Sequence, residues 1–593
     1  MIKLTKYFKW WYYPLIVVII GLVYIQVDFD LKLVDYMREI VNLVSKADQT
    51  GQSQTSLILK NGLEMLGYSL VSISSLIAVY FISSRIGANF VKDLRKRLFD
   101  KIDSFSLEEI NQFSTSSLIT RSTNDITQVQ MVTIILLRLA ITAPMTAIRA
   151  IMKITDINLT LTLPVIAGVV AVVVMISAIF IFVTPKFKVL QELNDSLNLV
   201  TRENLTGLRV VRAHNADGFE HAKFEKANAK LTKVNLFVNR GMQLMMPGMQ
   251  LVMNSVALAI TWIGASLIFK GTLGDNPYDG IGIQAQFSIY GFQILMSFMM
   301  LTMLFIMVPR GAVSGKRIME VLTTEPKIKD PENPVVFPEN EKVTLSFENV
   351  CFKYPGANEC VLEDISFEAK EGQTIAFVGS TGSGKSTIIN LIPRFFDTTN
   401  GDIKINGISI KAVKQETLLG LIGYVPQKGL LFSGTVRSNL LIGNPEASDE
   451  QLNQALDISQ AKNFVGRLEE GLESHVAQGG KNFSGGQRQR LCIARAIVKD
   501  PKIYIFDDSF SALDYNTDRA LRSALKSKTD KAINLIVAQR IGTIINADLI
   551  VVLDKGRAVG IGTHKDLLKN NKVYQEMAYS QLSKEELQDA SQS

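Results

Sequence analysis

Cysteine and histidine are scarce in this sequence, which has three cysteines and four histidines among 593 residues. Cys351, Cys360 and Cys492 have neither the spacing of metal ligands nor that of a disulfide framework. We therefore expect incidental thiols in a reducing compartment and no structural metal site. His214 and His221 stand seven residues apart, on one face of a helix, and a solvated surface explains that spacing better than a metal site does.

The N-terminal segment has no small-residue cleavage site of the kind that ends a signal peptide. Lys3, Lys6 and Lys9 precede an aromatic cluster at 10–13 and an apolar run at 15–25. Aromatic rings favour the headgroup level of a bilayer and lysines favour its cytoplasmic side, so we expect a membrane span with a cytoplasmic N-terminus. The net charge of +7 does not indicate a nucleic-acid partner, because many basic residues lie beside apolar runs.

Long apolar runs occupy the N-terminal half of the chain. A membrane-spanning helix needs about 20 largely apolar residues. The segments that meet this requirement are roughly 12–29, 62–85, 134–154, 160–184, 242–269 and 284–309. Six spans return the chain to the cytoplasm, so the C-terminal half is expected there. The long charged connections 86–133 and 185–241, with basic clusters at 92–97 and 209–212, predict two cytoplasmic helical hairpins.

The composition changes after the last span. We predict an α-helical polytopic membrane domain over 1–315, an extended proline-rich linker over 316–345, and a soluble domain over 346–582, followed by a polar tail at 583–593. In the soluble domain, strand-like runs alternate with helical patterns, which indicates an α/β fold with a largely parallel sheet.

A glycine-rich loop provides the strongest chemical signal. It follows a predicted strand at 374–378 and opens a helix, as a P-loop does. The loop residues that we expect to contact a nucleotide are Gly379, Ser380, Thr381, Gly382, Ser383, Gly384, Lys385, Ser386 and Thr387. Backbone N–H groups and the helix N-terminus favour phosphate oxygens, Lys385 reaches the terminal phosphates, and Ser386 can bind Mg²⁺.

Two further elements complete the phosphate chemistry. The strand at 503–506 ends in Asp507, which is placed to hold Mg²⁺ as in other P-loop ATPases. Between the two strands, Ser484, Gly485, Gly486 and Gln487 open a helix and predict a second phosphate-binding helix N-terminus.

The order of these motifs resembles the nucleotide-binding domain of ABC transporters, and six spans before such a domain resemble a type IV exporter half-transporter. The resemblance implies that Tyr354 stacks on adenine, that Gln427 contacts Mg²⁺, and that Asp514 belongs to a loop crossing a dimer interface. It also implies that 121–125 and 202–207 are intracellular-loop motifs, with coupling helices near 112–118 and 211–219. The implied cofactors are ATP and Mg²⁺.

Two positions depart from the family pattern. Asp508 stands where the family usually has a catalytic glutamate, and Gln539 stands where it usually has a histidine. The carboxylate of Asp508 is one methylene shorter, and a displacement of about 1 Å can cost about 10²-fold in rate. An amide such as that of Gln539 can donate a hydrogen bond but cannot carry the proton that histidine carries. Together these changes predict a site that binds ATP and turns it over slowly.

An intact second phosphate motif beside a degenerate P-loop site favours a heterodimer with a second half-transporter in a bacterial cell membrane. A slow homodimer is the alternative. For cargo we expect hydrophobic or amphipathic small molecules, as in multidrug efflux; a lipid or peptide exporter and a non-transporting, ATP-gated regulatory protein are the other readings.

Methionines are concentrated in the fifth and sixth spans. These are Met242, Met245, Met246, Met249, Met253, Met296, Met299, Met300, Met303 and Met307. Methionine suits promiscuous apolar binding surfaces, and helix packing explains the pattern equally well. Asp28, Asp30 and Arg149 are ionisable groups near or within the bilayer, where they are costly unless they pair or face water.

Overall fold

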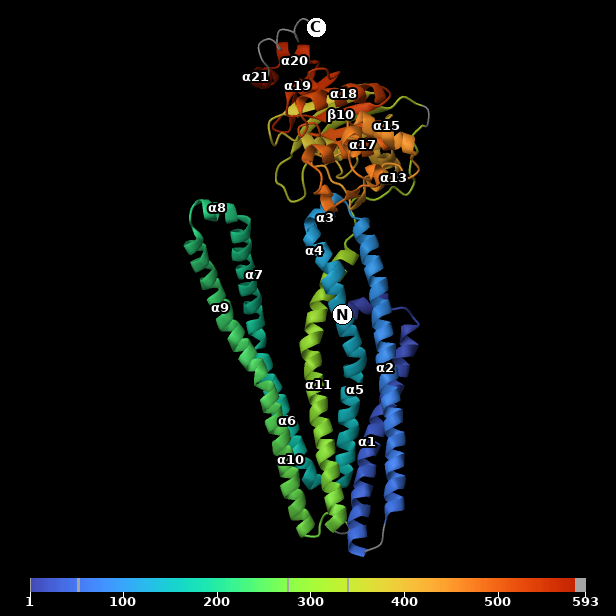
Figure 1. Cartoon of the computed structure of the whole chain (residues 1–593), viewed down its shortest axis with the longest axis vertical. Helices are drawn as coiled ribbons and strands as arrows, with labels where there is room; N and C mark the ends of the chain where they lie inside the picture. The colour runs from blue at the N-terminus through green and yellow to red at the C-terminus, as the bar shows by residue number, and fades with distance from the viewer. Residues whose placement is uncertain (1, 51–53, 275–276, 339–340, 582–593) are drawn as a thin grey trace. The chain divides into compact units, whose positions relative to one another are not determined.

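The computed structural model describes residues 2–50, 54–274, 277–338 and 341–581. The predicted polar tail at 583–593 lies outside these ranges. The chain forms two compact units, Met1–Asp103 with Ser116–Thr324, and Ser104–Thr115 with Glu325–Ser593. The first unit is helical, whereas the second contains the β-sheets (Figure 1).

The helical unit is built from long helices joined by short turns. Its elements are η1 (Ile2–Tyr7), α1 (Tyr12–Thr50), α2 (Thr55–Asp103), α4 (Thr115–Thr120), the π-helical turn η2 (Arg121–Asp125), α5 (Ile126–Ile157), α6 (Leu159–Phe182), α7 (Thr184–Thr206), α8 (Leu208–Ala213), α9 (Asp217–Gln243), α10 (Met245–Phe269) and α11 (Pro277–Thr323). Within the described ranges, six helical stretches are long and apolar enough to cross a membrane. Each predicted span lies in one of them, so the six-helix prediction is confirmed.

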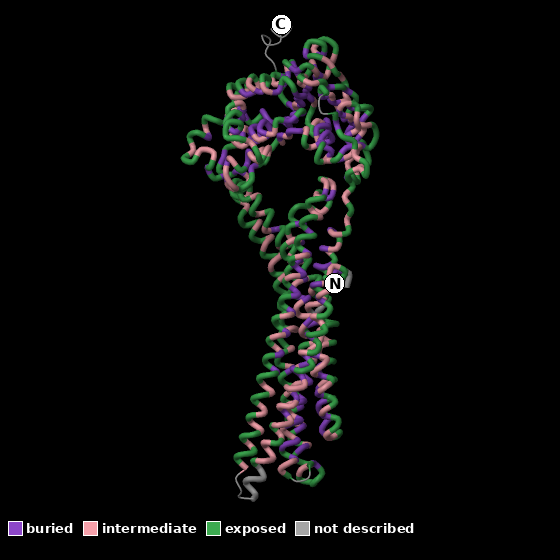
Figure 2. The backbone as a smooth tube through the Cα atoms, turned by 90° about the vertical axis from the view of Figure 1, so that its right-hand side faces the viewer, coloured by how far each residue is buried: buried purple, intermediate pink, exposed green. Residues whose placement is uncertain are grey.

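Exposed residues recur along the long helices, and buried residues are frequent in the sheet-containing unit (Figure 2). Many of the exposed residues on the helices are large and apolar. Leu63 is 71% exposed, Val174 62% and Trp262 77%. Such contiguous apolar surface requires a lipid environment or another subunit to cover it. Helix ends follow local capping: Asn158 ends α5 and caps α6, since its Oδ1 accepts from the backbone N–H of Thr160 at 2.9 Å.

Three boundaries differ from the prediction. A coupling helix is expected at 211–219, but α8 ends at Ala213 and α9 begins at Asp217. Asn215, with a φ of 51°, lies between these two helices. The coupling helix expected at 112–118 is divided between α3 (Leu107–Phe113) and α4 by Ser114, whose φ is 61°. The predicted linker begins at 316, but α11 continues to Thr323, because the first proline after that point is Pro326.

The second unit contains α3 and an α/β domain. Its six-stranded sheet has the order β12-β11-β3-β10-β9-β6, parallel except at β12, and a four-stranded antiparallel sheet has the order β2-β1-β4-β5. The strands are β1 (Thr344–Phe352), β2 (Leu362–Lys370), β3 (Thr374–Gly379), β4 (Asn400–Ile405), β5 (Ile408–Ser409), β6 (Ile422–Val425), β7 (Gly434–Thr435), β8 (His475–Val476), β9 (Ile503–Asp507), β10 (Ile533–Val537), β11 (Leu549–Asp554) and β12 (Arg557–Gly562). The helices are α12 (Lys385–Leu391), α13 (Gln415–Gly420), α14 (Val436–Leu440), α15 (Asp449–Ile458), α16 (Lys462–Val465), α17 (Gly485–Lys499), α18 (Tyr515–Lys528), α19 (Ile541–Ile544), α20 (His564–Asn570) and α21 (Lys572–Gln581), with short 3-10 turns η3 (Ile410–Ala412), η4 (Gly471–Glu473) and η5 (Gln478–Gly480).

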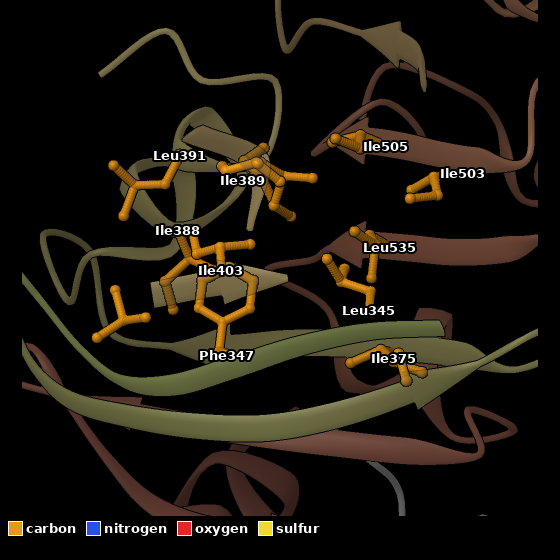
Figure 3. Packing of buried hydrophobic residues seen from close by; sticks show 14 of the residues in the cluster. Leu345, Phe347, Ile375, Ile388, Ile389, Leu391, Ile403, Ile503, Ile505 and Leu535 are labelled. Atoms are coloured by element: carbon orange, nitrogen blue, oxygen red, sulfur yellow. The ribbon is translucent and has the colours of Figure 1, made fainter. Parts of the chain in front are cut away.

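The helix that follows the P-loop is embedded in the core between the two sheets. Ile388 and Ile389 of α12 are fully buried in one cluster with Leu345 of β1 and with Ile375 and Ile505 of the parallel sheet (Figure 3). Close packing of this kind leaves little freedom for displacement. The P-loop therefore rests on a rigid base.

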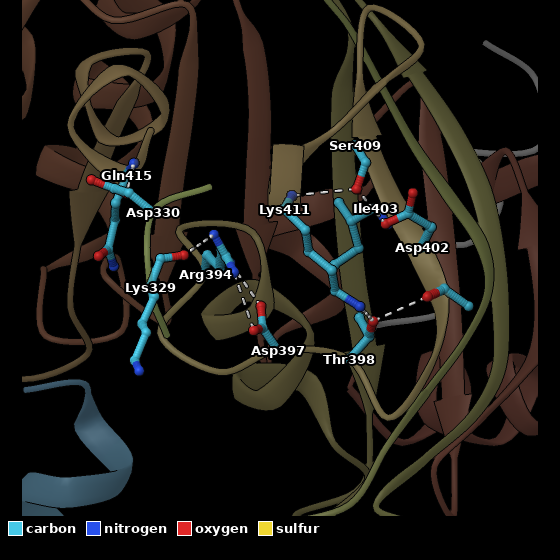
Figure 4. Close-up of polar contacts among 11 residues, drawn as sticks. Lys329, Asp330, Arg394, Asp397, Thr398, Asp402, Ile403, Ser409, Lys411 and Gln415 are labelled. Carbon is cyan, nitrogen blue, oxygen red and sulfur yellow. Dashed lines mark hydrogen bonds and ion pairs between the residues drawn. The ribbon is translucent and has the colours of Figure 1, made fainter. Parts of the chain in front are cut away.

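The segment after α11 is fastened to the same domain. Arg394, just past α12, is 5% exposed and donates from Nη1 to the carbonyl oxygen of Lys329 at 3.5 Å, while its Nε donates to Asp397 at 2.7 Å (Figure 4). The backbone N–H of Gln415 donates to Asp330 Oδ1 at 2.8 Å. The linker therefore runs against the domain instead of spanning open solvent.

Candidate nucleotide-binding site

The P-loop connects the carboxyl end of β3 to the N-terminus of α12. At Gly384 the φ is +100°, and a Cβ would lie 2.6 Å from Leu362 Cδ2. At Gly379 a Cβ would collide with the carbonyl oxygen of Leu553 on the neighbouring strand. Only glycine fits both positions, and the resulting tight turn presents backbone N–H groups to an anion.

Lys385 extends back over this loop. Its ammonium donates to the carbonyl oxygens of Gly379 and Ser380, both at 2.8 Å. Burial lowers the pKa of Lys385, while the nearby carboxylates of Asp508 and Asp507 act in the opposite direction. A terminal phosphate offers this ammonium stronger, charge-assisted hydrogen bonds than the two carbonyls do.

Ser386 and Asp507 meet as the P-loop and β9 patterns predict. The Ser386 hydroxyl donates to Asp507 Oδ1 at 3.0 Å. Burial raises the pKa of Asp507, the hydrogen bond from Ser386 lowers it, and the neighbouring Asp508 raises it. A hydroxyl and a buried carboxylate form the oxygen donor set that Mg²⁺ prefers, so these residues fit that ion.

Gln427 and Gln539, predicted to contact Mg²⁺ and the γ-phosphate, both donate to Asp508, which stands at the position of the catalytic base. Asp508 Oδ2 accepts from Gln539 Nε2 at 2.8 Å and from Gln427 Nε2 at 3.3 Å. Asp508 is 9% exposed and has a φ of 47°, a left-handed conformation that aspartate tolerates better than most residues. Both partners are amides, so neither can take or return a proton.

Tyr354 lies beside the P-loop helix. Its hydroxyl is 3.2 Å from Thr387 Oγ1, and its half-buried ring packs edge-on against Phe352 and Phe396, with centroids 4.8 and 5.4 Å away. The ring is thereby held in a fixed position next to the loop, as a base-stacking residue requires.

The predicted second phosphate motif lies at the start of α17. Ser484 and Gln487 form a reciprocal cap, with the Ser484 N–H donating to Gln487 Oε1 at 2.9 Å. A Cβ on Gly486 would lie 3.1 Å from the carbonyl oxygen of Ala512, and Asp514 caps α18 through the N–H of Thr517 at 3.0 Å. Among the described residues, no hydrogen bond joins Ser484–Gln487 to the P-loop.

Two connections to this site were not predicted. Gln489 of α17, 2% exposed, donates to the carbonyl oxygen of Pro426, next to Gln427, at 2.9 Å. Gln581 of α21 donates to the Gln539 carbonyl oxygen at 3.1 Å and accepts from the Ile541 N–H at 2.8 Å. Gln489 could have been noticed in the sequence, because it is a polar residue on the otherwise apolar face of a predicted helix. Nothing in the sequence distinguishes Gln581.

Family models match both halves of the chain: ABC transporter over residues 362–511 and ABC transporter transmembrane region over 41–277. An uncharacterized ABC transporter ATP-binding protein of Mycobacterium tuberculosis is 38% identical over 91% of this chain and 92% of its own length. A probable multidrug resistance ABC transporter ATP-binding/permease protein of Bacillus subtilis is 31% identical over 83% of each chain.

Among solved structures, a bacterial Atm1-family ABC exporter with ATP bound superposes with a TM-score of 0.78, covering 96% of this chain and 99% of its own, at 24% identity. This likeness concerns the fold.

Proposed function

The chain belongs to the ABC transporter family, and from that premise we propose that it is one half of a heterodimeric exporter whose own ATP site holds nucleotide and hydrolyses it slowly. Family membership establishes ATP-dependent transport by a multi-pass membrane protein. Exporters of this family work as dimers in a membrane. The heterodimer, the degenerate site, the cytoplasmic orientation and the bacterial cell membrane are parts of the proposal.

The observation that carries the proposal is the pair of glutamine amides on Asp508 Oδ2. The groups that bind phosphate and Mg²⁺, Lys385, Ser386 and Asp507, are in place, so ground-state binding is retained. The groups that act on water lack both a full-length carboxylate and an imidazole. Interactions missing only in the transition state reduce turnover without weakening binding.

We assign the site residues accordingly. In this chain's own site, residues 379–387 bind the phosphates and Tyr354 stacks on adenine. Gln427 contacts Mg²⁺ and transmits the ATP state to the membrane domain. Ser484–Gln487 and Asp514 complete the partner's site, where donors at the N-terminus of α17 face the γ-phosphate.

For cargo we propose hydrophobic small molecules. Met246 is 68% exposed and Met303 47%, so part of the methionine-rich surface of α10 and α11 is available for contact. Flexible, polarizable side chains suit varied apolar ligands. The Bacillus subtilis relative described above as a probable multidrug resistance protein supports the same class.

Nucleotide retention tests the degenerate site. We expect the purified heterodimer, loaded with labelled ATP and chased with unlabelled ATP, to keep about one labelled ATP per complex through many turnovers of the partner's site. Filter binding after the chase measures the retained label. Lys385→Ala removes the phosphate contact and should release it. If both sites of the parent complex lose label at the same rate, the holding role is refuted.

A further inference from the structure

Arg138 on α5 is a cation without a carboxylate partner among the described residues, unlike Arg38, Arg149 and Lys153. Arg149 pairs with Asp28, Lys153 with Asp35 at 2.7 Å, and Arg38 with Asp279 at 2.9 Å. Arg149 and Asp28, left open by the sequence, thus neutralise each other. Arg138 is not neutralised in this way, and an uncompensated charge within a span is costly.

The guanidinium of Arg138 is held in one orientation by α2. Its Nε donates to Ser83 Oγ at 2.8 Å, and its Nη2 donates to the Tyr80 carbonyl oxygen at 3.0 Å and to Ser84 Oγ at 2.6 Å. The Tyr80 ring centroid lies 3.8 Å from the guanidinium carbon. Nη1 has no partner among the described residues, so its two N–H groups are available for an external acceptor.

The frame that holds Arg138 is rigid. Ser83 is fully buried and donates to the Tyr80 carbonyl oxygen at 3.2 Å. One turn further along α2, a Cβ on Gly87 would lie 2.5 Å from Ile134 Cγ1 of α5, so the two helices are in close contact. Orientation of the guanidinium is therefore fixed before any ligand arrives, which lowers the entropic cost of binding.

The surface next to Arg138 is apolar and leads into the predicted span. Leu70, Ile73, Ile77 and Phe81 recur at helical spacing on α2 and are 66%, 53%, 63% and 63% exposed. Arg138 lies about one turn inside the predicted span 134–154, on the side where the long connection 86–133 leaves the membrane. A positive group beside an exposed apolar stripe matches an amphiphile with an anionic head.

We propose that Arg138, Ser84 and the α2 stripe bind an anionic phospholipid of the surrounding bilayer. The phosphate accepts from Nη1, and an acyl chain lies along Ile77 and Phe81. A phospholipid is the occupant because the Nη1 N–H groups of Arg138 suit an anionic phosphate and the exposed apolar stripe continues from there along a membrane-spanning helix. The inference is independent of the ATP-site assignment, so its failure would leave the proposed function intact.

Native mass spectrometry of the full-length chain, titrated in detergent with phosphatidylglycerol, phosphatidylcholine or dodecyl phosphate, tests this site. Arg138→Ala should weaken phosphatidylglycerol binding about tenfold, the loss expected for one charge-assisted hydrogen-bonded pair. It should weaken phosphatidylcholine binding less, because the choline cation offsets the charge of the phosphate that Arg138 contacts. Arg138→Lys keeps the charge without the planar fork and should give an intermediate loss. Arg138→Lys also provides the test of phosphatidylglycerol binding if the alanine variant does not fold.

Arg85→Ala is the matched control, because Arg85 is an exposed arginine next to Ser84 on α2. Its removal should not change phosphatidylglycerol binding. Equal losses from Arg85→Ala and Arg138→Ala would reduce the effect to general surface charge and overturn the site. Binding of dodecyl phosphate without phosphatidylglycerol would overturn the lipid assignment and indicate a soluble anionic amphiphile instead.

Discussion

Replacing Ser484 with arginine is expected to lower ATP hydrolysis by the assembled transporter by at least about 10²-fold, the cost of losing a preorganised group at a developing charge. Ser484 is the N-cap of α17, and its hydroxyl accepts from the Gln487 N–H at 3.3 Å. In the proposed complex, an arginine side chain at this helix N-terminus would occupy the volume assigned to the partner's γ-phosphate. Phosphate release by the purified complex measures the effect.

Ser448 provides a matched control in the same domain. It caps α15 with the same serine–glutamine reciprocal bonds: its N–H donates to Gln451 Oε1 at 2.8 Å, and its hydroxyl accepts from the Gln451 N–H at 3.3 Å. Ser448→Arg should therefore cost the same cap, about 1 kcal/mol of stability, without the loss of turnover. Comparable ATPase losses in the two variants would mean that α17 acts through folding alone.

Asp508→Asn tests whether the chain's own P-loop site and its Ser484 motif contribute differently to ATP hydrolysis. Because Asp508 belongs to the site that we propose to turn over slowly, the amide should reduce hydrolysis by the complex far less than Ser484→Arg does. If the two changes cause equal losses, the division of labour between the P-loop site and the Ser484 motif is wrong.

Much of this architecture could be predicted from the sequence, because its signals are local. Apolar run length alone located the six spans. The strand–loop–helix context of 374–392 identified the P-loop, and β3 and α12 are found there. The coupling helices were harder to place, since their ends depend on single left-handed residues, Ser114 and Asn215, in otherwise helical patterns.

The sequence indicated that Gln427, Asp508 and Gln539 belong to one site, but it could not predict that both glutamines donate to Asp508. Gln427, Asp508 and Gln539 follow different strands, β6, β9 and β10, and meet only because these strands are neighbours in one parallel sheet. Both amides donate to the same oxygen, Asp508 Oδ2, and this contact depends on the side-chain rotamers, which the sequence does not determine. The tether from Gln581 to the Gln539 segment depends on the packing of α21 and had no sequence signal.

If the site is degenerate as proposed, restoring the two family residues should raise its turnover. We expect the chain purified alone to hydrolyse ATP slowly, and Asp508→Glu combined with Gln539→His to raise that rate on the order of 10²-fold. The added methylene extends the carboxylate toward the attacking water. The imidazole can carry a proton, and it removes the amide that donates to Asp508 Oδ2 at 2.8 Å. Phosphate release by the homodimer, with Lys385→Ala added as the inactive control, measures the gain.

The single variants decide whether the two residues act as a unit. Asp508→Glu alone leaves the Gln539 amide beside the carboxylate, and Gln539→His alone leaves the carboxylate short, so each should give much less than its share of the double variant's gain. Glutamate tolerates the φ of 47° at position 508 less well than aspartate, at a cost of about 1 kcal/mol. Thermal unfolding should detect this cost. A double variant that is folded, binds ATP and remains as slow as the parent would show that the defect lies outside Asp508 and Gln539.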